Sequence, residues 1–205
     1  LLSKIKDISN IEIICKNDTR TNEDIISVLK GIGFKKFKLL THLSEYSLNK
    51  KLSVRIYHHR HIDSALMIFN EGKPWIINLN DCEIVPKECS YIRKRFGQFP
   101  ILLNQFSIAG FGGINSKELL SKEKNLILDN MKKQHLSLGC STTIPFASFC
   151  WFSNSDNNFL NQWHNSLKDV FEEFQNNSLH LYCLEPPSEF ISIESLISKS
   201  KSPSS

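Results

Sequence analysis

The segment 63–82 constrains the fold more than any other part of this sequence. It holds two apolar runs, at 63–69 and 75–79, separated by the turn sequence Asn-Glu-Gly at 70–72. Two strand-length runs joined by a short turn that contains Asn and Gly predict a β-hairpin. The second run is almost continuous in apolar residues, so its strand is expected to be buried on both faces. It ends at Asn80-Asp81-Cys82.

The rest of the chain alternates strands and helices, which predicts an α/β fold. The pattern begins with a strand at 11–15, a helix that starts at Thr21 or Asn22, and a strand at 34–40. Further on, the sequence predicts helices at 86–96, 116–136 and 157–174, a buried strand at 100–106, an apolar and aromatic stretch at 143–152, and a last strand at 179–184. The helix at 157–174 is expected to be single and amphipathic.

Composition excludes several classes of protein. The net charge is +4 and the basic residues are scattered, whereas nucleic-acid binding requires a dense basic patch. No signal peptide is visible in these residues, and no apolar run approaches the length that spans a membrane, so we expect a cytoplasmic protein with no membrane partner. The six cysteines include no Cys-x-x-Cys pair, which argues against a zinc ribbon and favours reduced thiols. His42 and His135 are expected at the surface.

Histidines and a carboxylate flank the predicted hairpin. His58, His59 and His61 precede it, and Asp81 follows it. The hairpin would return the chain so that His61 and Asp81 lie close together, and strand alternation puts His59 and His61 on one face. A poorly solvated carboxylate needs a partner, and a metal ion with imidazole ligands is one. The alternative is a polar strand edge and a turn that caps its own backbone.

The same segment resembles the metallo-β-lactamase superfamily, in which a His begins a hairpin and an Asp about twenty residues later ends it. The triplet Asn-Asp-Cys at 80–82 stands where many members have Gly-Asp-Thr. The stretches 101–110 and 144–153 are similar to the branch that includes UlaG-like hydrolases and the CMP-N-acetylneuraminate hydroxylase. The resemblance covers roughly residues 10–170.

This resemblance implies a partial αββα sandwich that lacks its leading strands. Residues 1–184 would be the C-terminal part of one domain, and residues 185–205 a largely disordered tail. The His-x-His-x-Asp-His motif of the family is absent, and we expect it upstream of Leu1. The chain would then be a fragment, inactive as it stands.

The function implied for the whole protein is that of a metal-dependent hydrolase, in which metal-activated water attacks an ester, amide or phosphodiester of a small molecule. Asp81 is the expected catalytic residue and metal ligand, with His61 and either His59 or His58 as further ligands. The expected metal is one or two zinc ions, with iron or manganese as alternatives.

Four further residues are expected to orient a ligand ring or contact substrate: Asp63, Asn80, Asn104 and Asn154, the last at a position where we expect relatives to carry His. Two alternatives stay open. One is a degenerate, non-catalytic member that binds a ligand or a partner, and the other is an oxidoreductase-type relative of the sialic-acid hydroxylase. The sequence does not fix the oligomeric state.

Overall fold

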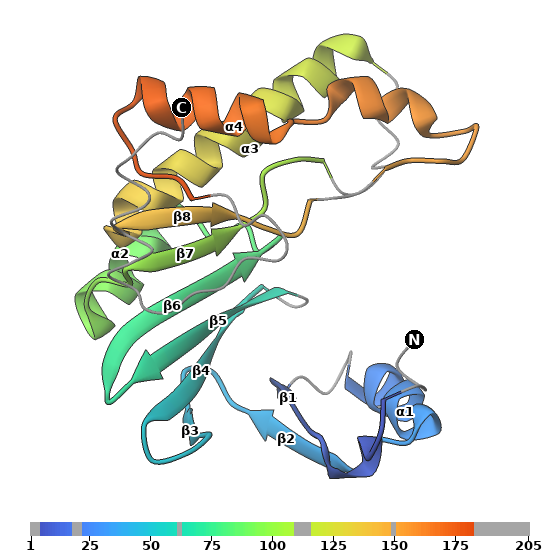
Figure 1. The fold of residues 1–205 in the computed structure, drawn as a ribbon, viewed down its shortest axis with the longest axis vertical. Helices are drawn as coiled ribbons and strands as arrows, with labels where there is room; N and C mark the ends of the chain where they lie inside the picture. Colours follow the sequence, from blue (N-terminus) through green and yellow to red (C-terminus); the bar gives the residue numbers. More distant parts are fainter. Residues whose placement is uncertain (1–4, 18–21, 61–62, 109–115, 149–150, 183–205) are drawn as a thin grey trace. The chain divides into compact units, whose positions relative to one another are not determined.

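The computed structural model describes residues 5–17, 22–60, 63–108, 116–148 and 151–182 (Figure 1). These residues fall into two compact units, which divide the chain at the bond between Gly72 and Lys73. Each unit has its own strands and its own apolar core. The α/β class predicted from the sequence is confirmed in both units.

The first unit begins with the predicted strand–helix–strand pattern. A short 3₁₀ helix, η2 (Ile8–Asn10), precedes β1 (Glu12–Lys16), α1 (Asn22–Ile32) and β2 (Lys36–Leu40). Strands β1 and β2 are parallel, as a helical crossover requires. Helix α1 stops at Gly33, whose φ of 120° is open to glycine but strained for other residues.

Three antiparallel strands complete the first unit: β3 (Glu45–Ser47), β4 (Leu52–His59) and β5 (Asp63–Asn70). They pair in the order β3-β4-β5. The apolar core of this unit is formed by Leu40, Val54 and Ile56, with Ile14 and Tyr46 packed against it. One face of β4 is therefore turned towards β1 and β2.

The turn predicted at 70–72 links β5 to the first strand of the second unit. Its central residues, Glu71 and Gly72, have φ angles of 50° and 77°. Two successive positive φ angles are the hallmark of the type I′ turns that connect strands by two residues. The backbone N–H of Glu71 also donates to the carbonyl of Lys51, 2.7 Å away. Residues 71 and 72 thus have the local conformation of a tight turn.

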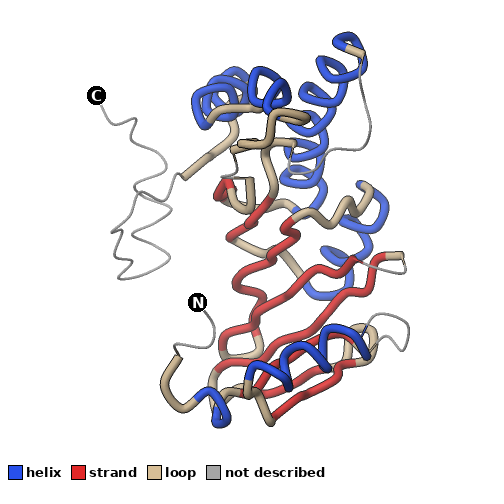
Figure 2. Tube along the Cα trace, turned by 90° about the vertical axis from the view of Figure 1, so that its right-hand side faces the viewer, coloured by secondary structure: helices blue, strands red, loops and turns tan. Residues whose placement is uncertain are grey.

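The second unit has three parallel strands connected by helices. Its first elements are β6 (Lys73–Asn80), α2 (Pro86–Phe96), β7 (Ile101–Asn104), α3 (Lys117–Leu138) and β8 (Thr142–Pro145). The strands pair in the order β6-β7-β8. Helices α2 and α3 pack together and lie along the same side of these strands (Figure 2). In β6, Ile77 and Leu79 are fully buried.

Local sequence signals fix the starts of the helices. Helix α2 begins at Pro86, which needs no hydrogen bond from its nitrogen at that position. The carboxylate of Glu88 accepts from the backbone N–H of Val85 at 3.0 Å. Ser116 caps α3 as predicted, because its hydroxyl accepts from the N–H of Leu119. Gly139 ends α3 in the left-handed conformation.

The single helix predicted at 157–174 is wrong. The structure has a 3₁₀ helix, η3 (Asn158–Trp163), and a separate helix α4 (Leu167–Asn176). Ser166 starts α4 through a capping box with Asp169, in which each side chain binds the backbone N–H of the other. The residue before it, Asn165, is held by its own hydrogen bonds elsewhere in the unit and does not continue the helix.

The chain after α4 returns to the strands. Leu181 forms an isolated parallel bridge with Thr143, in place of the longer strand expected at 179–184, of which 183–184 lie outside the described residues. Helices α3 and α4 enclose the main core of the unit, formed by Phe106, Leu128, Met131, Val170, Phe174 and Leu181. None of the helices in the described ranges is long and apolar enough to cross a membrane.

Candidate functional site

The carboxyl ends of β6, β7 and β8 meet at one edge of the second unit, because the three strands are parallel. Two backbone hydrogen bonds hold this edge together. The N–H of Gln105 donates to the carbonyl of Asn80 at 2.9 Å, and the N–H of Phe146 donates to that of Asn104 at 2.8 Å. In open α/β sheets this edge is the usual place for ligands. Asp81 lies here, directly after β6.

Asp81 presents an exposed carboxylate at this edge, so the expectation that this carboxylate is poorly solvated is wrong. One of its oxygens, Oδ1, accepts a hydrogen bond from the side-chain nitrogen of Asn80 at 2.7 Å. It forms no ion pair with any of the described residues. The carboxylate therefore keeps most of its acceptor capacity for a partner other than the described part of the chain.

Asn80 sets the direction of the chain just before Asp81. Its φ of 51° is left-handed, a conformation that Asn and Gly adopt more readily than other residues. Its backbone N–H donates to Oδ1 of Asn78 at 2.9 Å, so the polar turn also caps its own backbone. The self-capping turn and the exposed carboxylate, which the sequence analysis treated as alternatives, are both present. The cap involves Asn78 and Asn80 and leaves the carboxylate of Asp81 exposed.

A buried chain of amides anchors the loop that carries Asp81. Asn104, at the end of β7, is 4% exposed and donates from Nδ2 to Oε1 of Gln134 at 2.6 Å. Gln134 in turn donates from Nε2 to the carbonyl of Ile84 at 2.9 Å. Asn104, which was expected to orient a ligand or substrate, therefore has Gln134 as its partner. The only sequence signal for Gln134 is that it is a polar residue between Met131 and Leu138 on a buried face of α3.

Ser148 holds the segment that follows β7 through hydrogen bonds to its backbone. Its hydroxyl oxygen accepts from the N–H groups of Phe106 and Ser107, both at 3.1 Å, and it donates to the carbonyl of Ser107 at 3.3 Å. The hydroxyl of Ser107 accepts from the N–H of Asn165 at 2.7 Å. These bonds join the segments after β7 and β8 to the start of α4, so this part of the edge has a fixed shape.

The first unit brings together two other expected site residues. His59 and Asp63 are directly opposite each other in the β4–β5 pairing, so their side chains share one face. His59 is 4% exposed, and Asp63 is half-buried. The expectation that Asp63 holds a histidine ring is compatible with this register. His61 lies outside the described residues.

His58 is engaged with the backbone. Its ring nitrogen Nε2 lies 3.1 Å from the carbonyl oxygen of Leu40, which can only accept, so this nitrogen donates. Its own backbone N–H donates to Nδ1 of His42 at 3.1 Å. A neutral ring that donates from Nε2 carries its lone pair on Nδ1, so the alternative between His58 and His59 as a ligand stays open.

Asn154 organises its own turn. Its side-chain oxygen accepts from the N–H of Asp156 at 3.2 Å, and its carbonyl accepts from the N–H groups of Asn157 and Asn158 at 3.1 and 2.8 Å. The residue is exposed. Its side-chain nitrogen donates no hydrogen bond to the described residues, and the substrate contact expected of Asn154 stays a prediction.

His135 was expected at the surface, and this is wrong. Its side chain is 5% exposed, and Nδ1 lies 2.8 Å from the hydroxyl of Thr143. The ring stands edge-on to Phe174, with centroids 5.7 Å apart. Burial, which is the larger cause, and the neighbouring His180 together lower the pKa of His135 to about 4. The buried face of α3 therefore carries a neutral histidine.

The described residues do not make up a metal site on their own. They contain no group of three or more His, Cys, Asp or Glu side chains that could hold an ion. Asp81 supplies one carboxylate in the second unit, and His59 and Asp63 supply an imidazole and a carboxylate in the first. Two or more further ligands are required for a zinc site, which has four.

Comparison with known proteins gives a fold and no close relative. No protein-family model matches the sequence, and no curated protein matches it. The fold resembles that of the CmlA beta-hydroxylase. A CmlA variant superposes with a TM-score of 0.52 at 10% identity, over 78% of this chain and 34% of that one. The structure described as a diiron beta-hydroxylase from Streptomyces venezuelae gives a TM-score of 0.50 at 9% identity, over 78% and 35%.

The solved structures similar to this chain include members of the metallo-β-lactamase superfamily. One is a candidate zinc-dependent hydrolase from Thermotoga maritima, with a TM-score of 0.40 at 12% identity, over 68% of this chain and 61% of that one. The chain spans about a third of the length of the CmlA chains it matches. At these identities the likeness concerns the fold. The UlaG-like branch and the upstream motif stay predictions.

Proposed function

We propose that this chain is part of a metal-dependent hydrolase of the metallo-β-lactamase fold, with Asp81 as a metal ligand. One observation carries the proposal: an exposed carboxylate without an ion-pair partner in the described residues stands at the carboxyl end of β6. The loop behind it is anchored by the buried amides of Asn104 and Gln134. A fixed carboxylate with free lone pairs is suited to a divalent cation.

The pairing of His59 with Asp63 supports the proposal. A carboxylate opposite a histidine can hold the ring and set which nitrogen is free to bind a metal. His61 remains the other expected ligand. Zinc is the expected ion, with iron or manganese as alternatives.

An iron-dependent oxidation is the second candidate. It is favoured by the fold match to CmlA, which is described as a diiron beta-hydroxylase and gives TM-scores of 0.52 and 0.50. Carboxylate and imidazole ligands suit iron as well as zinc. The ligands named above are therefore the same for both candidates, and the metal and the reaction tell them apart.

The metal content of the protein expressed from its complete gene tests the role of Asp81. We expect Asp81→Ala to lose at least half of the bound metal, measured by elemental analysis after gel filtration. Asp156→Ala, which removes another exposed carboxylate of the second unit, is the matched control and should keep all of it. Full metal stoichiometry in Asp81→Ala would overturn the assignment.

Activity assays separate the two reactions. A hydrolase should cleave p-nitrophenyl esters or bis(p-nitrophenyl) phosphate without oxygen, and Asp81→Ala should abolish this cleavage. An iron oxygenase should consume oxygen in the presence of a reductant and show no such cleavage. A protein that binds no metal in any preparation would contradict both candidates.

A further inference from the structure

An open groove of about 650 Å³ lies in the segment that contains η3. Three aromatic side chains line it, those of Trp151, Phe152 and Phe159. The other lining residues are Ser153 and three amides, Asn158, Asn161 and Gln162. All seven are neutral, so the groove offers flat apolar surfaces and hydrogen-bonding groups but no charge.

Trp151 is the most exposed large apolar side chain in the described chain, at 76%. Leaving an indole ring in water forgoes the gain from burying one of the largest side chains. Isolated apolar residues at a surface are common, but an exposed tryptophan on the wall of a groove is typical of a binding surface. Trp151 is thus placed to cover a ligand.

The floor of the groove is firmly built. Oδ1 of Asn161 accepts from the N–H of Phe152 at 2.9 Å, and Nδ2 of Asn161 donates to the carbonyl of Phe152 at 2.8 Å. Below it, Leu160 is 1% exposed and packs with Ile108 and Leu120. These hydrogen bonds, and the packing of Phe152 and Phe159 against this core, fix part of the lining of the groove.

Two amides on the rim are available to a ligand. Asn158 and Gln162 are exposed, and their side chains make no hydrogen bond with the described residues. They are four positions apart across η3. Each primary amide offers both a donor and an acceptor, and hydroxyl groups need both. The described lining contains no Lys, Arg or His to take a phosphate or carboxylate.

We propose that this groove binds a neutral sugar ring, stacked on Trp151 and held by the amides of Asn158 and Gln162. The C–H face of a pyranose is apolar and slightly positive, which matches the negative face of an indole ring. The equatorial hydroxyls around its edge match amide donors and acceptors. The proposal rests on the groove alone and is independent of the metal chemistry proposed for Asp81.

A titration of the ¹⁵N-labelled protein with methyl β-D-glucopyranoside tests the proposal. The probe is small, so we expect a dissociation constant in the millimolar range. The indole N–H signal of Trp151 should move on addition of the glucoside, and those of Trp75 and Trp163 should move less. Adenosine, a planar aromatic nucleoside, is titrated in parallel.

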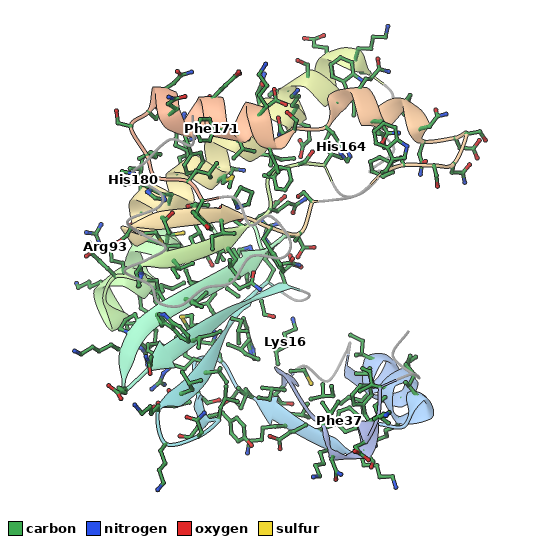
Figure 3. All side chains as sticks on the ribbon, in the orientation of Figure 1. Lys16, Phe37, Arg93, His164, Phe171 and His180 are labelled. Atoms are coloured by element: carbon green, nitrogen blue, oxygen red, sulfur yellow. The ribbon has the colours of Figure 1, made fainter. Side chains whose placement is uncertain are left out.

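Variants assign the binding to the groove. Trp151→Ala should weaken binding at least tenfold, and Gln162→Ala several-fold. Phe171→Ala is the matched control, because Phe171 is an exposed aromatic residue on α4 that does not line the groove. It lies away from His164, the residue that follows η3 (Figure 3), and its removal should leave binding unchanged.

Three results would overturn the proposal. The first is the absence of shifts with the glucoside at tens of millimolar. The second is glucoside binding that survives Trp151→Ala unchanged in a folded variant, as judged by its spectrum. The third is binding of adenosine without binding of the glucoside, which would assign the groove to a nucleobase. Gln162→Ala provides the same test if Trp151→Ala does not fold.

Discussion

Helices α1 and α4 illustrate how differently the two units bury their apolar residues. In α1, Ile25 and Val28 are 54% and 63% exposed. In α4, Val170 and Phe174 are fully buried. Burial of apolar surface is the main stabilising contribution to a fold, so α4 contributes more to the core of its unit than these residues of α1 do to theirs. Asp81 belongs to the unit that contains α4, and His59 and Asp63 belong to the unit that contains α1.

Removal of a buried aromatic ring should produce the largest difference in stability between a buried and an exposed position. We expect Phe174→Ala to lower the free energy of unfolding by about 3–5 kcal/mol, since it leaves a cavity in the core of the second unit. Phe171→Ala on the same helix is the control and should cost far less, because Phe171 is 43% exposed. Urea unfolding followed by circular dichroism measures both.

Val28→Ala in α1 extends this test to the first unit. It should change the free energy of unfolding by no more than about 0.5 kcal/mol, as expected for an exposed position. A cost equal to that of Phe174→Ala would show that α1 is covered in the protein and would remove the contrast between the units.

The buried His135 should make stability depend on pH. Its folded pKa of about 4 lies below the ordinary value of 6.5. Because the unfolded chain binds this proton first, stability is fully present above pH 6.5 and falls as the pH drops towards 4, by roughly 3 kcal/mol in all. His135→Leu should remove this slope, measured by urea unfolding at several pH values.

His180→Gln is the control for His135. It should keep most of the slope, because burial is the larger cause of the shift and His180 the smaller. Asp169 contributes in a separate range. Burial raises the pKa of Asp169, but the hydrogen bonds from Ser166 and the charge of Lys124 outweigh it and lower the pKa below 3.8, so its contribution is lost as the pH falls below that value. An unchanged slope in His135→Leu would contradict the assignment.

The smallest expected difference is in the free energy of unfolding lost when a residue that anchors a proposed ligand is changed in one unit or in the other. Gln134→Leu should cost about 2 kcal/mol, because it leaves Nδ2 of Asn104 and the carbonyl of Ile84 buried without their partner. It should also speed hydrogen exchange at Cys82 and Ile84, in the loop of Asp81. His58→Leu in the first unit removes one bond of a half-buried ring and should cost about 1 kcal/mol. Equal costs would show that both ligand-bearing ends are equally well anchored.

Local signals allowed much of the fold to be predicted. Helix α2 has the predicted bounds 86–96, because Pro86 starts it and the glycine at 97 ends it. The turn at 70–72 and the cap at Ser116 are likewise set by neighbouring residues. The break before α4 could not be predicted in this way, because Asn165 is held by Ser107, 58 positions earlier in the sequence.

The candidate site was predictable only where it depends on neighbouring residues in the sequence. The position of Asp81 at a strand end follows from the apolar run before it. Gln134 bonds to residues 30 and 50 positions away, so its role depends on how α3 packs. Asn80 stands where many members of the resembled superfamily have glycine, and its left-handed φ of 51° explains why both residues are suitable there.

The hydroxyl of Ser148 has a consequence for anions. Two successive backbone N–H groups, those of Phe106 and Ser107, donate to one oxygen, and paired N–H groups of this kind can hold a phosphate or a carboxylate. Ser148 already occupies this pair, with both distances at 3.1 Å. Any free anion would have to compete with an oxygen that is tethered to the same chain at a high effective concentration. An anion should therefore bind poorly at this position, because the hydroxyl of Ser148 already accepts from both N–H groups.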